Sequence, residues 1–195
     1  MRSTRIITVA IGATALLIGG APLAYGQASA SGTSAAEAQA AARLDDATIV
    51  AIFDAANTAD IETGELAAQR GSSKAVRDFG AQLVNDHRAV RQMGRDLAKK
   101  LGVTPTPPAD DAGAKAHAAA MASLRATSGT EFDLAFLRHE VEFHAAVMDA
   151  VQKTLLPAIQ NAELKALVEK VGPAFHAHML RAEALAKQIA EEASR

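Results

Sequence analysis

The stretch 132–151, FDLAFLRHEVEFHAAVMDAV, decides how the rest of the chain is read. As a helix turning about 100° per residue, it places Asp133, Glu140 and His144 in a narrow wedge of one face, among apolar residues. Acidic and imidazole groups on an apolar stripe are buried together, and their burial is costly unless something pairs with them. The stretch therefore predicts a helix of a packed core, and its polar wedge is the first candidate for a functional site.

The composition favours helices over sheets. The 195 residues are 49% hydrophobic, enough for one domain with a sizeable core, and they are rich in Ala with no Trp and one Tyr. The formal net charge of −2 gives no strongly basic field, so no nucleic-acid partner is expected. The complete absence of Cys excludes thiol catalysis, zinc–thiolate sites and cysteine-ligated iron–sulfur clusters.

The N-terminal residues 1–28 have the pattern of a secretory signal peptide. Arg2 and Arg5 precede an apolar run at 6–20, and small residues follow Pro22. The run is short for a membrane span, which needs about 20 residues. An uncleaved N-terminal anchor is the alternative. Residues 29–44 are expected to form a flexible leader, and 45–192 the folded domain. The protein is therefore expected to be periplasmic or secreted, with no transmembrane span in the mature chain.

Apolar residues at three- and four-residue spacing predict four long helices. Asp46 is the expected N-cap of the first helix, and a short connection at Gly71 makes the first two an antiparallel hairpin. Pro157 is expected to end or kink the third helix, and Pro173 to kink the fourth. The helices are expected at about 45–70, 74–101, 129–156 and 162–191.

A long connection separates the second and third helices. Residues 102–108, GVTPTPP, cannot be helical, and the Ala-rich segment after them has room for a short helix. Residues 102–128 are enough to cross the length of a bundle, on the order of 40 Å. The prediction is an all-α, ferritin-like four-helix bundle with a long crossover between helices two and three. Simple up-down-up-down order is the alternative.

This topology brings a set of carboxylates and imidazoles to similar depth in the bundle. With the second and third helices parallel, a rise of about 1.5 Å per residue places the set within about two turns. Mixed Glu and His ligation from facing helices is how bundles hold iron, manganese or zinc. The Glu-x-x-His spacing of di-iron bundles is absent. The candidate metal ligands are Glu62, His87, Glu140, His144 and His178.

A metal-free polar network is the alternative for the same residues, each imidazole bonding a carboxylate or carbonyl. Asp133 is interpreted as a helix cap paired with Thr130 rather than as a ligand. Asp60 and Asp86 are expected to point towards solvent or a helix seam. Three more imidazoles fall off the apolar stripes and are expected at the surface: His117, His139 and His176.

The segments 55–87, 132–144 and 171–185 resemble an exported bacterial family called domain of unknown function four-one-four-two. The resemblance rests on Glu62-x-Gly64-x-Leu66-Ala67, the pair Asp86-His87, Phe132-Asp133, His144, and Pro173 followed by His178. It covers about 45–190. It implies a ferritin-like bundle of the outer membrane or periplasm, with no established activity, and it fixes no carboxylate at Glu140.

Two hypotheses of function follow. One is a non-enzymatic periplasmic bundle that binds a partner or envelope component, with a polar core that fixes helix register. The other is a metal-binding, redox-related bundle holding iron, manganese or zinc through the Glu and His ligands named above. The sequence identifies neither a substrate nor a particular partner.

Overall fold

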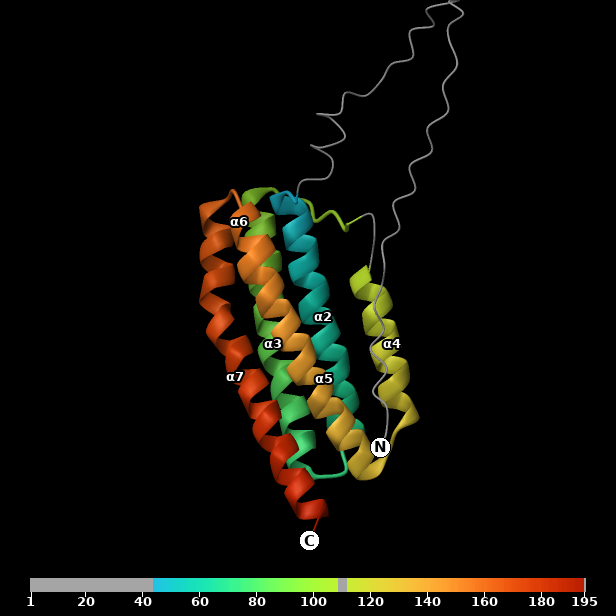
Figure 1. Cartoon of the computed structure of the whole chain (residues 1–195). Coiled ribbons are helices and arrows are strands. Elements are labelled where there is room, and N and C mark those ends of the chain that lie inside the picture. The colour runs from blue at the N-terminus through green and yellow to red at the C-terminus, as the bar shows by residue number, and fades with distance from the viewer. Residues whose placement is uncertain (1–43, 109–111, 195) are drawn as a thin grey trace, which may run out of the picture.

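The structure is a computed structural model that describes residues 44–108 and 112–194. The expected signal peptide, and the leader up to residue 43, lie outside the described residues. Within that part of the chain every regular element is a helix, as the composition predicted (Figure 1). The helices are α2 (Asp46–Arg70), α3 (Lys74–Leu101), α4 (Ala112–Ala126), α5 (Gly129–Ala150), the π-helix η1 (Val151–Leu155), α6 (Leu156–Ala158) and α7 (Ala162–Ala193).

Four long helices, α2, α3, α5 and α7, lie side by side, and α4 lies on the outside of this bundle (Figure 1). The helices α2 and α3 form one antiparallel hairpin, and α5 and α7 form the other. The helix α4, 15 residues and about 22 Å long, carries the chain back to the end where α3 began. The helices α3 and α5 therefore run in the same direction, which sets the depths of their side chains.

Apolar clusters fill both ends of the bundle. At the end that holds the α2–α3 turn, Phe79, Phe132 and Phe136 are fully buried together. At the opposite end, Ile49 of α2 packs with Leu164 of α7 and with residues of η1. The buried ionisable residues of the middle turns of α2, α3, α5 and α7 lie between these ends. Apolar packing at both ends thus seals a polar layer in the centre.

Asp45, rather than the predicted Asp46, caps α2. Its carboxylate accepts the Thr48 N–H at 2.7 Å. The Asp46 carboxylate instead accepts the backbone N–H groups of Gln160 and Asn161, at 2.9 and 2.8 Å. Asp46 therefore holds the turn before α7 against the start of α2, a contact that local sequence rules do not reach.

Asp133 is a cap, but for another helix. Its buried carboxylate accepts the N–H groups of Ser72 and Ser73, at 2.7 and 2.8 Å, in the turn between α2 and α3. The N-cap of its own helix, Ser128, makes no side-chain cap bond. The predicted pairing with Thr130 is therefore wrong, because the free N–H groups of a neighbouring turn lie within reach of the carboxylate.

The helices α2 and α3 approach closely through two glycines. A Cβ added at Gly80 would lie 2.6 Å from the carbonyl oxygen of Gly64 and 2.8 Å from the Cβ of Ala67. Only glycine permits this approach. It brings polar side chains of α2 and α3 into hydrogen-bond contact in the central layer.

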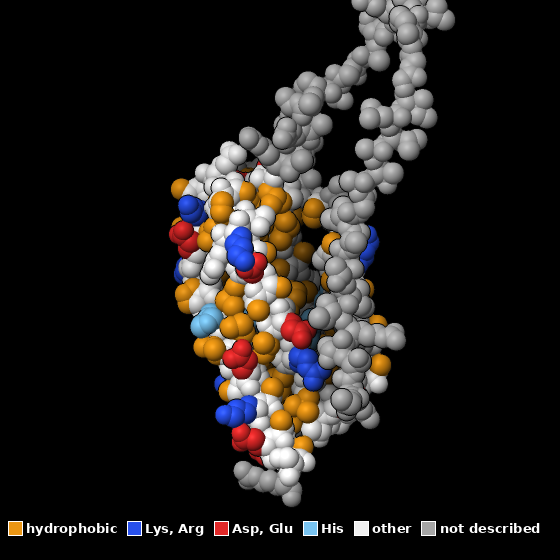
Figure 2. All heavy atoms as spheres, viewed as in Figure 1, with side chains coloured by type: hydrophobic (Ala, Val, Ile, Leu, Met, Phe, Trp, Pro, Cys, Tyr) orange, Lys and Arg blue, Asp and Glu red, His pale blue; other side chains and the backbone are white. Residues whose placement is uncertain are grey.

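Prolines occur near the end of the third long helix and inside the fourth. The predicted third helix continues as far as Ala158, but its last turns include the π-helix η1. The helix α7 continues through Pro173. None of the described helices combines the length and hydrophobicity that a membrane span requires. On the face shown in Figure 2, acidic and basic side chains are interspersed rather than gathered into a patch of one sign.

Candidate metal centre

Three imidazoles from three helices meet in the central layer: His87 of α3, His144 of α5 and His178 of α7. They form the histidine cluster, and each residue is at most 4% exposed. Their ring centroids lie 5.2–5.6 Å apart. One ring nitrogen of each lies within 4.8 Å of a nitrogen of the other two. The structure thus brings together in one cluster three of the five ligands predicted from the sequence, and Glu140, a fourth, lies against it.

The proton position on His87 follows from its neighbour on α2. Asn57 donates its Nδ2–H to the Phe53 carbonyl at 2.8 Å, which turns its Oδ1 towards His87. That oxygen lies 3.0 Å from His87 Nδ1. An amide oxygen only accepts, so Nδ1 carries the hydrogen and Nε2 keeps its lone pair.

The other two imidazoles are oriented in the same way. His144 Nδ1 lies 2.9 Å from the Glu140 carbonyl oxygen, and His178 Nε2 lies 3.0 Å from Asp86 Oδ2. Both partners accept hydrogen bonds, so these nitrogens donate. The lone pairs that remain are on His144 Nε2 and His178 Nδ1.

The three remaining nitrogens, His87 Nε2, His144 Nε2 and His178 Nδ1, are buried and have no hydrogen-bond partner. Each is an acceptor, so they cannot satisfy one another. A buried polar group left without a partner costs about 1–3 kcal/mol. Metal-bound histidines show the same pattern, in which the second ring nitrogen donates to a carboxylate or carbonyl. The arrangement fits a cation held by three lone pairs.

Burial keeps the imidazoles of His87 and His144 neutral at physiological pH. Burial, aided by the nearby imidazoles, lowers the pKa of His87 to about 2. Burial also lowers the pKa of His144 to about 4, against the opposing effect of its hydrogen bond to the Glu140 carbonyl. Neutral imidazole is the form that binds a metal ion, so no proton has to leave these rings first.

Two carboxyl groups, Asp60 of α2 and Glu140 of α5, lie against the histidine cluster and form the acidic pair. Asp60 Oδ2 lies 3.4 Å from His87 Nδ1, and Glu140 Oε2 lies 3.5 Å from His144 Nδ1. The Thr63 hydroxyl donates to Glu140 Oε1 at 3.0 Å. An oxygen of each carboxyl and a nitrogen of His144 lie within 4.8 Å of one another, which makes a second group with ligand spacing.

The acidic pair is uncharged or shares a proton unless a positive ion is nearby. Burial raises the pKa of Glu140 to about 8. Burial, and then the Glu140 carboxylate, raise the pKa of Asp60 well above its usual range. Asp60 Oδ1 and Glu140 Oε2 have no hydrogen-bond partner. A divalent cation beside them would favour their ionised forms.

Glu62 lies away from the cluster, contrary to its predicted place among the ligands. Its side chain is 51% exposed and lies 2.7 Å from the ring nitrogen of His117 on α4. The acidic residue that α2 contributes is Asp60, which the sequence analysis directed to solvent or a seam. The sequence contains a signal that Asp60 faces the core. Asp60 lies seven residues, or two helical turns, from both Phe53 and Ala67 on the same stripe of α2.

The other polar residues fall close to their predicted surroundings. Asp86 is partly exposed in the α3–α7 seam, where it bonds His178. His176 is exposed, as predicted. His117 and His139 are half-buried rather than on the open surface, because His117, on α4, faces Glu62 of α2 and the Phe143 ring lies beside His139.

Residues 31–185 match the family model described as "Domain of unknown function (DUF4142)". The chain belongs to the DUF4142 family. No curated protein matches the chain, and no solved structure does. The family description names no activity, so the chemistry of this DUF4142 protein has to be argued from its own histidine cluster and acidic pair.

Proposed function

We propose that the protein binds a first-row transition metal ion through His87, His144 and His178, with Asp60 and Glu140 as adjacent carboxylates. The observation that carries the proposal is a set of three buried ring nitrogens without a hydrogen-bond partner, on three imidazoles whose ring centroids lie 5.2–5.6 Å apart. Each imidazole has its other nitrogen committed to an acceptor on a different residue. In a metal site, such a hydrogen bond holds the imidazole with its other nitrogen directed at the ion. Without a cation, the three buried lone pairs would stay unsatisfied.

The donor set favours certain metals. Neutral imidazoles suit zinc and iron, whereas manganese prefers oxygen ligands and would rely more on the acidic pair. Two ionised carboxylates would balance the charge of a divalent ion in this buried layer. Iron bound here would supply a redox-active centre, and zinc would supply a structural or Lewis-acid one. The chain's own part is to exclude water, fix the imidazole tautomers and hold or release the proton of the acidic pair.

The proposal includes a ferritin-like bundle that works in the periplasm. The long connection through α4 and the parallel course of α3 and α5 support that connectivity (Figure 1). The pattern of the N-terminal residues 1–28 and the absence of Cys support export. The competing function is a metal-free bundle that binds an envelope component and uses the polar layer only to fix helix register.

Metal analysis of the full chain, purified without chelator, tests the proposal. We expect one metal ion per chain, or saturable binding of zinc or iron(II) to metal-free protein. The variants His144→Ala and His178→Ala should lose it. Asn57→Ala, which frees His87 from its orienting partner, should weaken binding by about 10–100-fold. The matched controls are Glu62→Ala and His176→Ala, which change exposed residues of α2 and α7 and should bind as the wild type does.

A thermal measurement accompanies the titration. Zinc at a hundred times its Kd should stabilise the wild type by about 2.7 kcal/mol and leave His144→Ala unaffected. Circular dichroism shows whether each variant keeps its helices. If the folded wild type takes up no metal under saturating conditions, the histidine cluster is a metal-free polar core and the proposal is wrong.

A further inference from the structure

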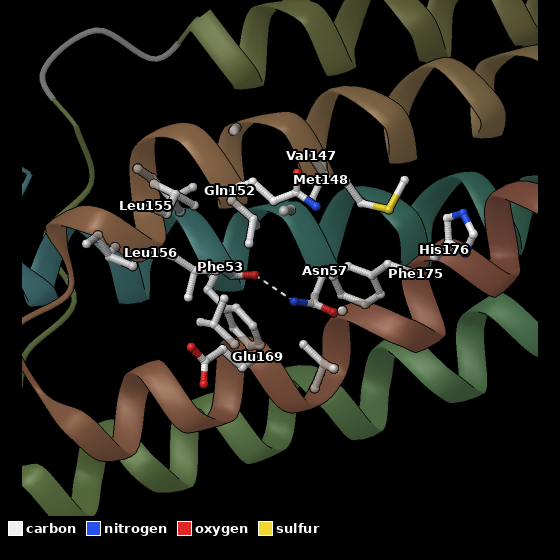
Figure 3. A pocket seen from close by; sticks show the side chains of 18 of the residues that line it. Phe53, Asn57, Val147, Met148, Gln152, Leu155, Leu156, Glu169, Phe175 and His176 are labelled. Carbon is white, nitrogen blue, oxygen red and sulfur yellow. Dashed lines mark hydrogen bonds between the residues drawn. The ribbon is translucent and has the colours of Figure 1, made fainter.

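An apolar cavity of about 580 Å³ lies beside the histidine cluster, bounded by α2, by α5 with η1 and α6, and by α7. We call it the apolar cavity. Figure 3 shows side chains from these helices pointing into the same space, with Asn57 drawn beside Phe175 and its hydrogen bond to Phe53 as a dashed line. Aliphatic residues make up most of its wall, among them Ile49, Ile52, Val147, Leu155 and Val168. Its volume lies within the range of small-molecule sites, about 300–1,000 Å³.

One π-helix and a Gly-Pro pair inside an α-helix line this cavity. The π-helix η1 forms one wall, and π turns are frequent at functional sites. On α7, Gly172 presents no side chain, and a Cβ there would meet nothing within 4 Å. Pro173 has no N–H to give the Glu169 carbonyl, four residues before it. Glycine and proline both disfavour a helix interior, so the open space is kept at a cost in helix stability.

The polar residues of the wall restrict what the cavity can hold. Asn57 is already bonded to Phe53 and His87, which leaves one hydrogen of its Nδ2 for a ligand. The other polar side chains are exposed, which places them at the rim: Gln152, Glu169 and His176. Among the described residues that line the cavity there is no Lys or Arg. A carboxylate or phosphate head group would meet Glu169 without a lining cation to balance it.

The size of the cavity sets the size of the ligand. A methylene group is close in size to a water molecule, and the cavity has room for about twenty groups of that size. We propose that the apolar cavity binds an uncharged amphiphile, with a hydrocarbon chain inside and a hydroxyl or similar head group at the rim formed by Gln152, Glu169 and His176. The head group would hydrogen-bond there, and Glu169 would disfavour a negatively charged one.

The apolar cavity and the histidine cluster share part of their walls but are separate sites. Phe175 lines the cavity and stacks on the His87 ring at a centroid distance of 5.0 Å. The cavity proposal depends on the apolar wall and the rim charge, not on a metal ion. Its test therefore leaves Asn57 and Phe175 unchanged, and it uses metal-free protein throughout.

The test measures binding of the uncharged fluorescent probe N-phenylnaphthylamine to the full chain, and its displacement by dodecanol, dodecanoate and dodecylammonium. All variants keep the N-terminal segment, so differences between them report the cavity. Gly172→Leu should fill part of the space and weaken probe binding about tenfold, as if two methylene groups were no longer buried. It should also raise the Tm. Ala166→Leu is the matched control, because it adds the same bulk at an exposed position of α7 outside the cavity wall.

The charge preference is tested at the rim. Dodecanol should displace the probe from the wild type at a concentration about threefold to fivefold below that of dodecanoate. This is the size of effect expected when the exposed Glu169 carboxylate repels one carboxylate head group. Glu169→Lys should remove this preference, whereas Glu183→Lys, at an exposed position outside the wall, should keep it. Equal probe binding by Gly172→Leu and wild type overturns the cavity site. Displacement by dodecanoate or by dodecylammonium at a concentration as low as that of dodecanol overturns the uncharged ligand.

Discussion

Asp133 offers the sharpest test of how the bundle is held together. The expected result of Asp133→Ala is a large loss of stability from the α2–α3 turn, not from the start of α5. The carboxylate accepts two backbone N–H groups from Ser72 and Ser73, and the side chain is buried. Removing it leaves both donors without their partner and leaves a small void beneath the turn.

The magnitude follows from these two bonds. Hydrogen bonds to a charged group contribute about 1.5–3 kcal/mol each. Ser72 is exposed, so water can replace part of its lost bond. We therefore expect Asp133→Ala to cost about 3 kcal/mol, which lowers the Tm of a domain of this size by about 6–12 °C. Asp133→Asn keeps one acceptor oxygen but no charge, and should cost about half as much.

Urea denaturation followed by circular dichroism measures the free energy of unfolding, and amide hydrogen exchange locates the change. The Ser72 and Ser73 amides should exchange faster in Asp133→Ala. Glu131→Ala, an exposed neighbour on the first turn of α5, should change stability by less than about 0.5 kcal/mol, as should Thr130→Ala. A loss below about 1 kcal/mol in Asp133→Ala, or an equal loss in Thr130→Ala, would refute the cross-helix cap.

Two further predictions concern packing and pH. Gly80→Ala should destabilise the protein by about 1–2 kcal/mol, because its Cβ would clash with the Gly64 carbonyl at 2.6 Å, whereas Gly172→Ala, with open space around it, should stabilise by up to about 1 kcal/mol. If thermal melts show that Gly80→Ala and Gly172→Ala raise the Tm by the same amount, the close approach of α2 and α3 is contradicted. In metal-free protein the free energy of unfolding should be highest between about pH 4.5 and 6.5. Below that range it falls because the folded pKa values of His87 and His144, about 2 and about 4, lie under the ordinary 6.5, so unfolded chains bind more protons. Above that range stability falls because the folded pKa values of Glu140, about 8, and of Asp60 are raised, so the folded protein holds protons that the unfolded chain has already released. A steady rise in stability from pH 5 to 9 would contradict this assignment.

Much of the architecture could be predicted because it depends on short-range rules. Apolar spacing and capping residues located α2 and α3 to within about a residue, and proline placed the break after α3. The long connection indicated that α3 and α5 run in the same direction. A fixed rise per residue then placed His87, His144 and His178 at one depth, and the structure brings their rings together.

Contacts between helices were beyond such rules. Asp46 and Asp133 both have the sequence signature of a local cap, yet each caps a turn that is distant in the chain. Glu62 was preferred to Asp60 although the periodicity of α2 favours Asp60, and α4 then gave Glu62 a partner outside the core. Which carboxylate faces the imidazoles depends on helix rotation, and that rotation is set by the close approach at Gly64 and Gly80.

The sequence by itself determined the helical class, the order of the helices in the chain and the position of each imidazole along its own helix, because periodicity and rise per residue are properties of a single helix. Only the tertiary structure decided the partner of each ring nitrogen: the amide of Asn57 for His87, the Glu140 carbonyl for His144 and Asp86 for His178. Those partners lie on other helices for His87 and His178. Hydrogen-bond direction depends on fractions of an ångström in their packing, and it leaves one buried nitrogen of each of the three imidazoles without a hydrogen-bond partner.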